Sequence, residues 1–469
     1  MKTKPLGFFD LALMAVAMTL SIRWIATAAA AGPASLPLWG LAVAGFMAPL
    51  VLATADLTTR FEDDGGIYAW TRAGLGPMPG FLIGWLYWTC NLPYFSGLLY
   101  FIINAAAMAG GGRIETAAAD PLVFAATAVT IAAAVGALHV AGLGTGKWLA
   151  NLGAAAGCCL LAVLVAAGAV LAVRHGPATA FTGVSYAPPI NANGAALWAT
   201  MVFAFGGPEA LAFLRGEVEG GVAKIVKVLA VVGVFLAGAY AAGTAAMLAI
   251  LPAQEVSRLA GVPEAIRQSL GRLGLGPLAP AALILLAGSM LGAYSAWFGI
   301  AARLPMVIGA DGGLPSALAR RSERSGAPTT ALLVQTAAVI ALIALGQAGA
   351  SVKAAYDFLI SMSVISYTLP FVFLFIVYLR LQGSLRPAGA WTPPGGARLG
   401  RLVGWVGLAV TISAIGCTLV PSPEATDKVA ADVKLVVACA GLILSGFVVR
   451  ILTVWWRSAV ATRGAVQGR

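Results

Sequence analysis

The sequence consists almost entirely of long apolar segments that follow one another with short connectors between them. Twelve such segments cover residues 7–31, 37–58, 79–108, 120–141, 148–173, 194–214, 224–251, 277–303, 329–348, 354–379, 402–420 and 431–453. Each is long enough to cross a bilayer, which takes roughly 20 residues of helix. A segment in lipid must satisfy its own backbone hydrogen bonds, and barrel-type alternation is absent, so the spans are predicted to be helices. The sequence therefore predicts an all-α integral membrane protein with twelve transmembrane helices.

Composition and charge exclude several other classes of protein. Of the 469 residues, 60% are hydrophobic and 10% are charged, whereas soluble domains carry about a quarter charged residues. The net charge of +11 comes from scattered connector residues without an aromatic-interleaved basic patch, so no nucleic-acid partner is expected. With both termini cytoplasmic, 20 of the 29 Lys and Arg residues lie inside and 8 outside, as the positive-inside rule expects. We therefore expect a multi-pass protein of the cell (plasma) membrane with cytoplasmic termini.

The remaining signals point away from an enzyme and from a cleaved leader. The first segment resembles a signal peptide, but Arg23 interrupts it, and we expect residues 7–31 to stay as a span. His139 and His175 lie near span ends and are expected at an interface. No metal-spaced cluster, phosphate loop or nucleophile elbow is present, so we expect no cofactor. The cysteines all fall in apolar segments and are predicted to be small buried thiols: Cys90, Cys158, Cys159, Cys417 and Cys439.

Two charged residues lie inside apolar segments where the helix is interrupted. Ser21-Ile22-Arg23 interrupts the first segment, and Gly206-Gly207-Pro208 precedes Glu209 in the sixth. A charge at the centre of the membrane costs about 2.5 to 3.5 kcal/mol, so each must be compensated. Either the two residues neutralise each other, or Arg23 braces the bundle on backbone carbonyls, or both face a cavity at the midplane and act on a ligand or a proton. The sequence leaves these hypotheses open.

Four stretches resemble the amino acid/polyamine/organocation (APC) superfamily of transporters. EDDGGIYAWTRAGLGPMPGFLIGWLYW, at 62–88, is similar to the family's entry into its third span. FAFGGPEA, followed by RGEVEGGVAKIVKV, resembles the unwound sixth helix and its continuation. RLPMVIGADGGLPSALARRSERSGAPTTALLV resembles the connection between spans eight and nine, and LGFFDLALMAVAMTLSIRW the first helix. The resemblance covers about the first 380 residues.

The resemblance implies a five-plus-five inverted repeat, the LeuT-like fold, with broken helices 1 and 6 and two further C-terminal helices. Residues 1–173 would form the first repeat with helices 1–5, and residues 194–380 the second with helices 6–10. Residues 399–455 would hold helices 11 and 12, and residues 456–469 a cytoplasmic tail.

The same resemblance assigns candidate site residues. Ser21, Ile22 and Arg23 stand where many members have Gly-Ser-Gly, whose backbone amides bind the substrate carboxylate. In this chain Arg23 and Trp24 would narrow the site. The guanidinium group of Arg23 is able to bind a carboxylate with two hydrogen bonds in place of the backbone amides. Glu209 matches a carboxylate implicated in proton response. Substrate and gating positions are expected at Phe203, Phe205, Gly206, Gly207 and Trp297.

Other candidates are interpreted as structural. Trp85, Trp88 and Tyr94 are expected to be packing or interfacial residues. Ser289 and Ser295 resemble half of a sodium site, but serine in a packed helix usually bonds its own backbone, so proton coupling is preferred to sodium.

Together these features predict a secondary active transporter for an amino acid or related small amine, working by alternating access as a proton symporter or an exchanger (antiporter). The partners expected are this small-molecule substrate and the lipid bilayer, and the oligomeric state is not predicted. The alternatives are a polyamine transporter, and a non-transporting amino-acid sensor or subunit with the same fold.

Overall fold

A computed structural model gives the fold of the chain. It describes residues 6–61, 65–181, 186, 191–218, 221–347, 352–384, 386–387, 390–393, 395–419 and 428–467. Parts of the quoted motifs, at 62–64 and 219–220, and the basic residues Lys2 and Lys4 lie outside these ranges. Within them every regular element is helical, and the single isolated β-bridge joins Leu6 to Val218.

The N-terminal half forms helices that follow the apolar segments. They are α1 (Phe8–Thr19), α2 (Arg23–Ala29), α3 (Ser35–Ala42), the π-helical η1 (Val43–Met47), α4 (Ala48–Arg60), α5 (Gly66–Leu75), α6 (Pro77–Thr89), α7 (Asn91–Gly110), α8 (Gly112–Ala118), α9 (Pro121–Ala141) and α10 (Leu143–His175).

The C-terminal half is built in the same way. Its elements are α11 (Ala192–Ala204), the 3₁₀ helix η3 (Pro208–Glu217), α12 (Val222–Ile250), η4 (Ala253–Glu255), α13 (Gly261–Arg272), η5 (Gly276–Leu278), α14 (Ala279–Ala301), α15 (Arg303–Ala310), η6 (Ser316–Ala319), α16 (Thr329–Gln347), α17 (Val352–Leu381), α18 (Gly396–Thr418) and α19 (Lys428–Gln467).

Ten of the described helical stretches are long and apolar enough to cross a membrane, and eleven if the bent pair α1 and α2 forms one span. The predicted ninth span corresponds to α16, whose described apolar part, Thr329–Ala344, is shorter than the others. The all-helical architecture with many spans is therefore confirmed, and the count of twelve stays a prediction.

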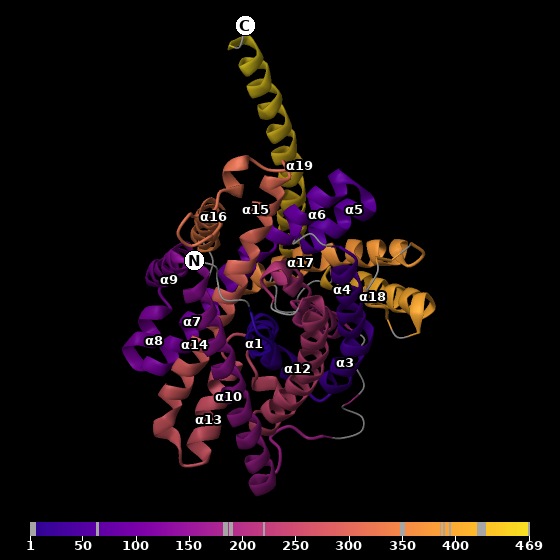
Figure 1. Cartoon of the computed structure of the whole chain (residues 1–469). Coiled ribbons are helices and arrows are strands. Elements are labelled where there is room, and N and C mark those ends of the chain that lie inside the picture. Colours follow the sequence, from indigo (N-terminus) through magenta and orange to yellow (C-terminus); the bar gives the residue numbers. More distant parts are fainter. Residues whose placement is uncertain are drawn as a thin grey trace.

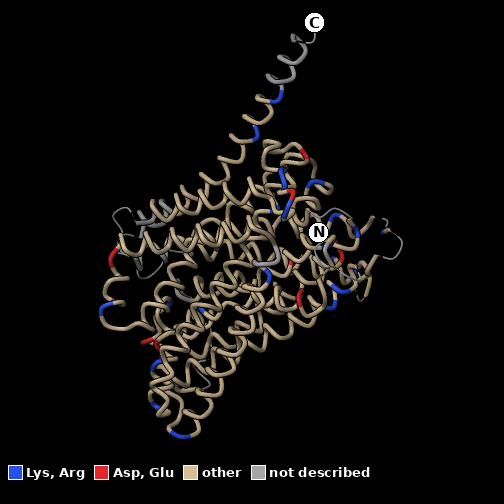
Figure 2. Tube along the Cα trace, turned by 60° about the vertical axis from the view of Figure 1, so that its left-hand side comes forward, with Lys and Arg blue, Asp and Glu red and all other residues tan. Residues whose placement is uncertain are grey.

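The helices form a bundle around α1, which packs on α10, α12 and α14 near the centre of the molecule (Figure 1). Helix α19 packs on α6 and α17 and then continues beyond the body of the bundle toward the C-terminus. In Figure 2, most charged residues lie toward the lower left and the right of the view, with largely uncharged helical turns between them. This distribution fits a bundle whose middle lies in lipid.

The prediction of five buried thiols is only partly correct. Cys90 and Cys439 are buried, but Cys158 and Cys417 are half-buried and Cys159 is exposed on the outside of α10. An apolar segment in a membrane is apolar on its lipid face as well as on its packed face, so the sequence does not distinguish the two.

Helices α10 and α14 approach each other closely at a pair of glycines. A Cβ atom on Gly292 would lie 2.5 Å from the Gly153 Cα and 2.8 Å from the carbonyl oxygen of Leu149. Both atoms belong to the backbone of α10, which, unlike a side chain, cannot change rotamer to relieve the contact. Small residues let membrane helices pack at this separation, and the pair fixes α14 against α10.

Replacing Gly292 by alanine is therefore expected to destabilise the bundle by about 1 to 3 kcal/mol, the usual cost of overpacking. The measurement is the apparent melting temperature of the purified protein in detergent. Gly288→Ala is the matched control, because a Cβ atom at Gly288 on the same helix meets nothing within 4 Å. Equal melting temperatures for the two variants would contradict the close approach.

A buried carboxylate joins the end of α4 to the end of α17. The side chain of Asp56 is fully buried and accepts hydrogen bonds from Arg60 Nε at 2.8 Å and Nη2 at 3.2 Å. Arg386 Nη2 and Gln382 Nε2 reach the same carboxylate at 3.2 and 3.1 Å. Arg60 also donates to the carbonyl oxygen of Leu381 at 2.8 Å. This cluster, Asp56 with Arg60, Gln382 and Arg386, ties together segments more than 300 residues apart.

Candidate functional site

The first span is interrupted where the sequence places Ser21. Helix α1 ends at Thr19, α2 begins at Arg23, and the two helices are bent by 44°. The hydroxyl of Tyr240, from α12, occupies the interruption: it accepts from the Ser21 N–H at 3.2 Å and lies 2.5 Å from the carbonyl oxygen of Thr19. Trp297 Nε1 donates to the carbonyl oxygen of Met18 at 2.6 Å. These side chains satisfy backbone groups that the interruption releases.

The sixth span changes conformation at the glycine pair. Helix α11 ends at Ala204, and the chain continues after Gly207 as the 3₁₀ helix η3. Gly207 has φ +133°, a value that residues with a side chain rarely adopt. A Cβ atom there would lie 2.6 Å from Thr19 Oγ1, and one on Gly206 would lie 2.3 Å from the Tyr367 ring. Glycine at both positions therefore lets the two interruptions touch each other.

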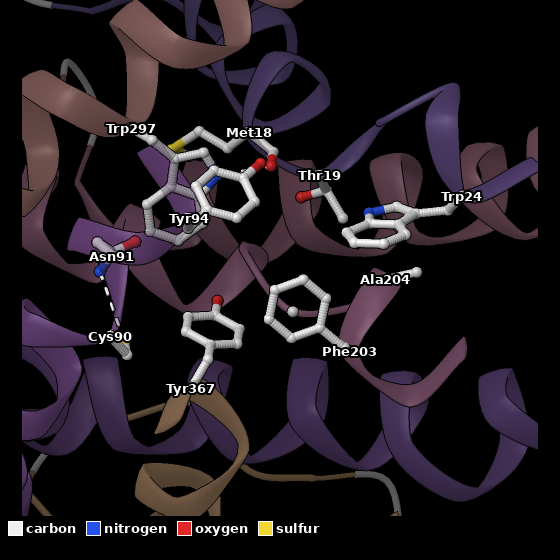
Figure 3. Close-up of a pocket in the computed structure, with 11 residues that line it drawn as sticks. Met18, Thr19, Trp24, Cys90, Asn91, Tyr94, Phe203, Ala204, Trp297 and Tyr367 are labelled. Atoms are coloured by element: carbon white, nitrogen blue, oxygen red, sulfur yellow. Dashed lines mark hydrogen bonds between the residues drawn. The ribbon is translucent and has the colours of Figure 1, made fainter. Parts of the chain in front are cut away.

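A small, partly open cavity of about 20 Å³ lies between the two interruptions. Figure 3 shows the rings of Trp24, Tyr94, Phe203, Trp297 and Tyr367 arranged around it. A volume of this size holds about one water molecule, so an amino-acid-sized ligand requires the rings to move apart. The cavity is lined by Met18, Thr19, Trp24, Cys90, Asn91, Tyr94, Phe203, Ala204, Gly206, Trp297 and Tyr367.

Glu209 lies beside this cavity in a closed set of hydrogen bonds. The side chain is buried, and its Oε1 accepts from the hydroxyls of Tyr87 at 2.5 Å and Tyr367 at 2.6 Å. Its Oε2 accepts from the N–H of Gly207 at 2.9 Å. Three donors from α6, α17 and the glycine turn thus compensate the carboxylate. Because Tyr367 also lines the cavity, the cavity wall is bonded directly to Glu209.

Arg23 is compensated differently. Its side chain is fully buried, and none of its three side-chain nitrogens has a hydrogen-bond partner among the described residues. The guanidinium carbon lies 4.1 Å from the ring centroid of Trp24 and 4.9 Å from that of Tyr94, two residues that line the cavity. No hydrogen bond or ion pair joins Arg23 to Glu209, although the structure describes both, so the two charges do not neutralise each other by contact here.

The sequence of the chain matches a known protein family over most of its length. The family model described as "Amino acid permease" matches residues 6–445, nearly the whole chain. The chain belongs to the amino acid permease family. Members of this family are transporters, so the protein is a multi-span membrane transporter and not an enzyme, as the sequence predicted.

Three relatives illustrate how this permease compares with known proteins. An uncharacterized transporter of Legionella pneumophila is 24% identical over 429 residues, which is 91% of each chain. A putative arginine/ornithine antiporter of Escherichia coli is 42% identical over 84 residues, 16% of this chain and 18% of the relative. The crystal structure of MhsT in complex with L-phenylalanine is 15% identical, with a TM-score of 0.60, over 87% of this chain and 97% of that one. The last likeness supports the LeuT-like class of fold.

The permease structure brings together only some of the predicted site residues. Trp24, Phe203, Gly206 and Trp297 line the cavity, while Gly207 and Glu209 lie directly behind it. The others do not line the cavity: Ser21, Ile22, Arg23 and Phe205. Phe205 instead packs its ring on Trp39 and Tyr240.

Several residues of the site were missed or misjudged from sequence. Tyr94 was expected to pack or to lie at an interface, but it lines the cavity. Tyr87 and Tyr367, which hold Glu209, were not singled out, because a tyrosine in an apolar segment carries no signal of its partner. The expectation for Trp85 and Trp88 agrees with their contacts, since their Nε1 atoms bond Leu442 and Gln335.

A second, smaller set of polar residues also differs from expectation. His139 was predicted at an interface but is buried, and its Nε2 lies 3.0 Å from Ser295 Oγ. Ser295 is therefore bonded to a histidine rather than to its own backbone. Among the described residues, no group of three or more His, Cys, Asp or Glu side chains is arranged to hold a metal ion. The sodium hypothesis gains no support from this pair.

Proposed function

We propose that this permease is a secondary active transporter that moves an amino acid or a related small amine by alternating access. The observation that carries the proposal is the cavity where the interruptions of α1–α2 and α11–η3 meet. Paired interruptions of this kind form the central site of inverted-repeat transporters. The relatives named as transporter and antiporter support the same class of activity.

The domain organisation is part of this proposal. Residues 1–173 and 194–380 act as the two inverted repeats, residues 399–455 as two additional helices and residues 456–469 as a cytoplasmic tail. Both termini face the cytoplasm of a protein in the plasma membrane. Alternating access then moves one repeat against the other around the cavity.

Glu209 is the group we propose for proton coupling. As a carboxylate it accepts from Tyr87, Tyr367 and Gly207, whereas a protonated carboxyl group also donates a hydrogen bond. Protonation therefore adds a donor to a group whose three partners are all donors, and so changes this set of hydrogen bonds. Since Tyr367 lines the cavity, a proton on Glu209 would loosen a wall of the substrate site. Exchange without net proton movement is the alternative form of coupling.

The test is uptake by the purified protein in liposomes. Radiolabelled amino acids and amines are presented with and without an inward proton gradient. The proposal expects saturable uptake of at least one compound, competed by its unlabelled form and increased by the gradient. Failure of every compound under both conditions would overturn it.

One observation favours a second candidate, a sensor or subunit that binds a ligand without transporting it. The cavity of about 20 Å³ is small, and Trp24, next to the segment Ser21-Ile22-Arg23 that stands where many members have Gly-Ser-Gly, lines it. A sensor would show thermal stabilisation by an amino acid but no uptake in the same liposomes.

A further inference from the structure

The burial of Arg23 sets an electrostatic requirement on the site. The side chain is fully buried at the start of α2, and an arginine stays charged in a protein. Its Nε, Nη1 and Nη2 atoms find no acceptor among the described residues. A buried charge is normally paired and hydrogen-bonded, because otherwise its desolvation is not offset. The aromatic rings of Trp24 and Tyr94 attract the cation but accept none of its five N–H groups in a normal hydrogen bond.

The carboxylate of the site does not meet this requirement. Glu209 is held by three donors and makes no contact with Arg23. Its two oxygens are already engaged by Tyr87, Tyr367 and Gly207. The site as a whole therefore contains a compensated anion and a cation that lacks a hydrogen-bonded counterion.

A second polar group at the cavity also lacks a partner. The hydroxyl of Thr19, the last residue of α1, is buried, lines the cavity and has no hydrogen-bond partner among the described residues. The N–H of Ser21, at the interruption, already donates to Tyr240. The Arg23 guanidinium and the Thr19 hydroxyl are thus side-chain donors without partners on the two sides of the α1–α2 interruption.

From these contacts we infer that Arg23 is the anion-binding residue of the site, and that the ligand is a small carboxylate. Arg23 does not itself line the cavity, but its guanidinium lies against the rings of Trp24 and Tyr94, which do. When these rings move apart to admit a ligand, the guanidinium takes the carboxylate, and the Thr19 hydroxyl is a second donor to it. The body of the ligand lies among the rings of Trp24, Phe203 and Trp297. This inference rests on the proposed function and names its substrate class.

A site of this kind also rejects one class of ligand. A ligand whose ionised groups are all cationic brings no counterion for Arg23, and Glu209 already accepts hydrogen bonds from three donors. Diamines and amines without a carboxylate are therefore excluded. The sequence left amines and polyamines open as substrates, and a site of this kind would not bind them.

The test uses matched ligands that differ only in their charged groups. The probes are L-phenylalanine, 3-phenylpropionate, L-phenylalaninamide and phenethylamine, the corresponding four compounds built on alanine, and putrescine. Binding is measured as the ligand-dependent thermal shift of the purified full-length protein. We expect stabilisation by carboxylate-bearing members of a series and none by its amine-only member or by putrescine. Stabilisation by an amine alone, or by no carboxylate at all, would overturn the inference.

Variants locate the effect at Arg23. Arg23→Gln is expected to weaken the carboxylate ligands by about 10- to 100-fold, the range for a lost hydrogen bond to a charged group. Arg23→Lys keeps the positive charge but loses the two-pronged geometry of the guanidinium group. Its affinity for the carboxylate ligands is expected to lie between those of the wild type and Arg23→Gln. Thr19→Val is expected to weaken the same ligands, whereas Thr54→Val, which removes another buried unpartnered hydroxyl away from the cavity, leaves them unchanged. Equal affinity in wild type and Arg23→Gln would overturn the inference.

The ligand-free melting temperature separates this role from a structural brace. An unpartnered buried charge opposes folding, so ligand-free Arg23→Gln is expected to melt at or above the wild-type temperature. If Arg23 were a structural brace, Arg23→Gln would melt at a lower temperature than the wild type and would still prefer the carboxylate ligands. That result would contradict the inference. Failure of the proposed function is read separately, as the absence of liposome uptake for every compound, whatever the thermal shifts are.

Discussion

Glu209→Gln is expected to lower uptake driven by a proton gradient by at least about tenfold, since a lost hydrogen bond to a charged group is worth about 1.5 to 3 kcal/mol. The glutamine oxygen accepts from one or both tyrosines, but its amide nitrogen is a donor and cannot accept from the N–H of Gly207. The variant also cannot carry a proton. Uptake in liposomes with an inward proton gradient measures the effect.

Two comparisons make the Glu209 result specific. Exchange of internal for external substrate, which needs no net proton movement, is expected to be reduced less than gradient-driven uptake. Tyr87→Phe removes one donor to Oε1 while keeping the carboxylate, so the response to the gradient should persist in it. Gradient-driven uptake at the wild-type rate in Glu209→Gln would exclude Glu209 from coupling.

Asp56→Ala is expected to destabilise the protein by about 3 to 5 kcal/mol, the cost of removing one partner of a buried ion pair. The carboxylate is fully buried and bonds both Arg60 and Arg386. Without it, two cations are left facing each other between α4 and the end of α17. The expected measurements are a lower melting temperature and a lower yield of folded protein from detergent extracts.

The chain contains a matched control for Asp56. Glu264 pairs with Arg267 three residues later on α13, but the two side chains are 29% and 50% exposed. Exposed pairs of this kind contribute about 0 to 1 kcal/mol, so Glu264→Ala should leave the melting temperature almost unchanged. Similar losses for Asp56→Ala and Glu264→Ala would show that burial of the Asp56 cluster contributes nothing.

The fold was predictable from sequence because lipid imposes a simple rule. A span must be apolar for its whole length, so α9, α10, α12 and α18 follow the predicted segments closely. The interruption of the first span was also visible, because Ser21 and Arg23 are polar residues in an otherwise apolar run. In the sixth span the change was marked by Gly206-Gly207-Pro208, because proline lacks the N–H and cannot continue a regular helix.

The partners of these residues were not predictable. Nothing near Glu209 in the chain indicates Tyr87, 122 residues before it, or Tyr367, 158 residues after it. The cavity residues Cys90, Asn91 and Tyr94 lie in a continuous apolar segment, where periodicity does not reveal which side faces the centre. A bond between Arg23 and Glu209 was one of the alternatives that the sequence left open, and only the structure separates the two residues.

Counterflow in liposomes tests most directly the central claim, which is that ligand enters the cavity between the two interruptions alternately from each side. Liposomes that contain the purified protein and a high concentration of one unlabelled amino acid are diluted into a trace of the same labelled compound, without a proton gradient. For at least one carboxylate-bearing amino acid, the account predicts a transient accumulation of label above equilibrium, and a smaller one with Arg23→Gln. Label that never exceeds its level in protein-free liposomes, for any amino acid or amine, would contradict it.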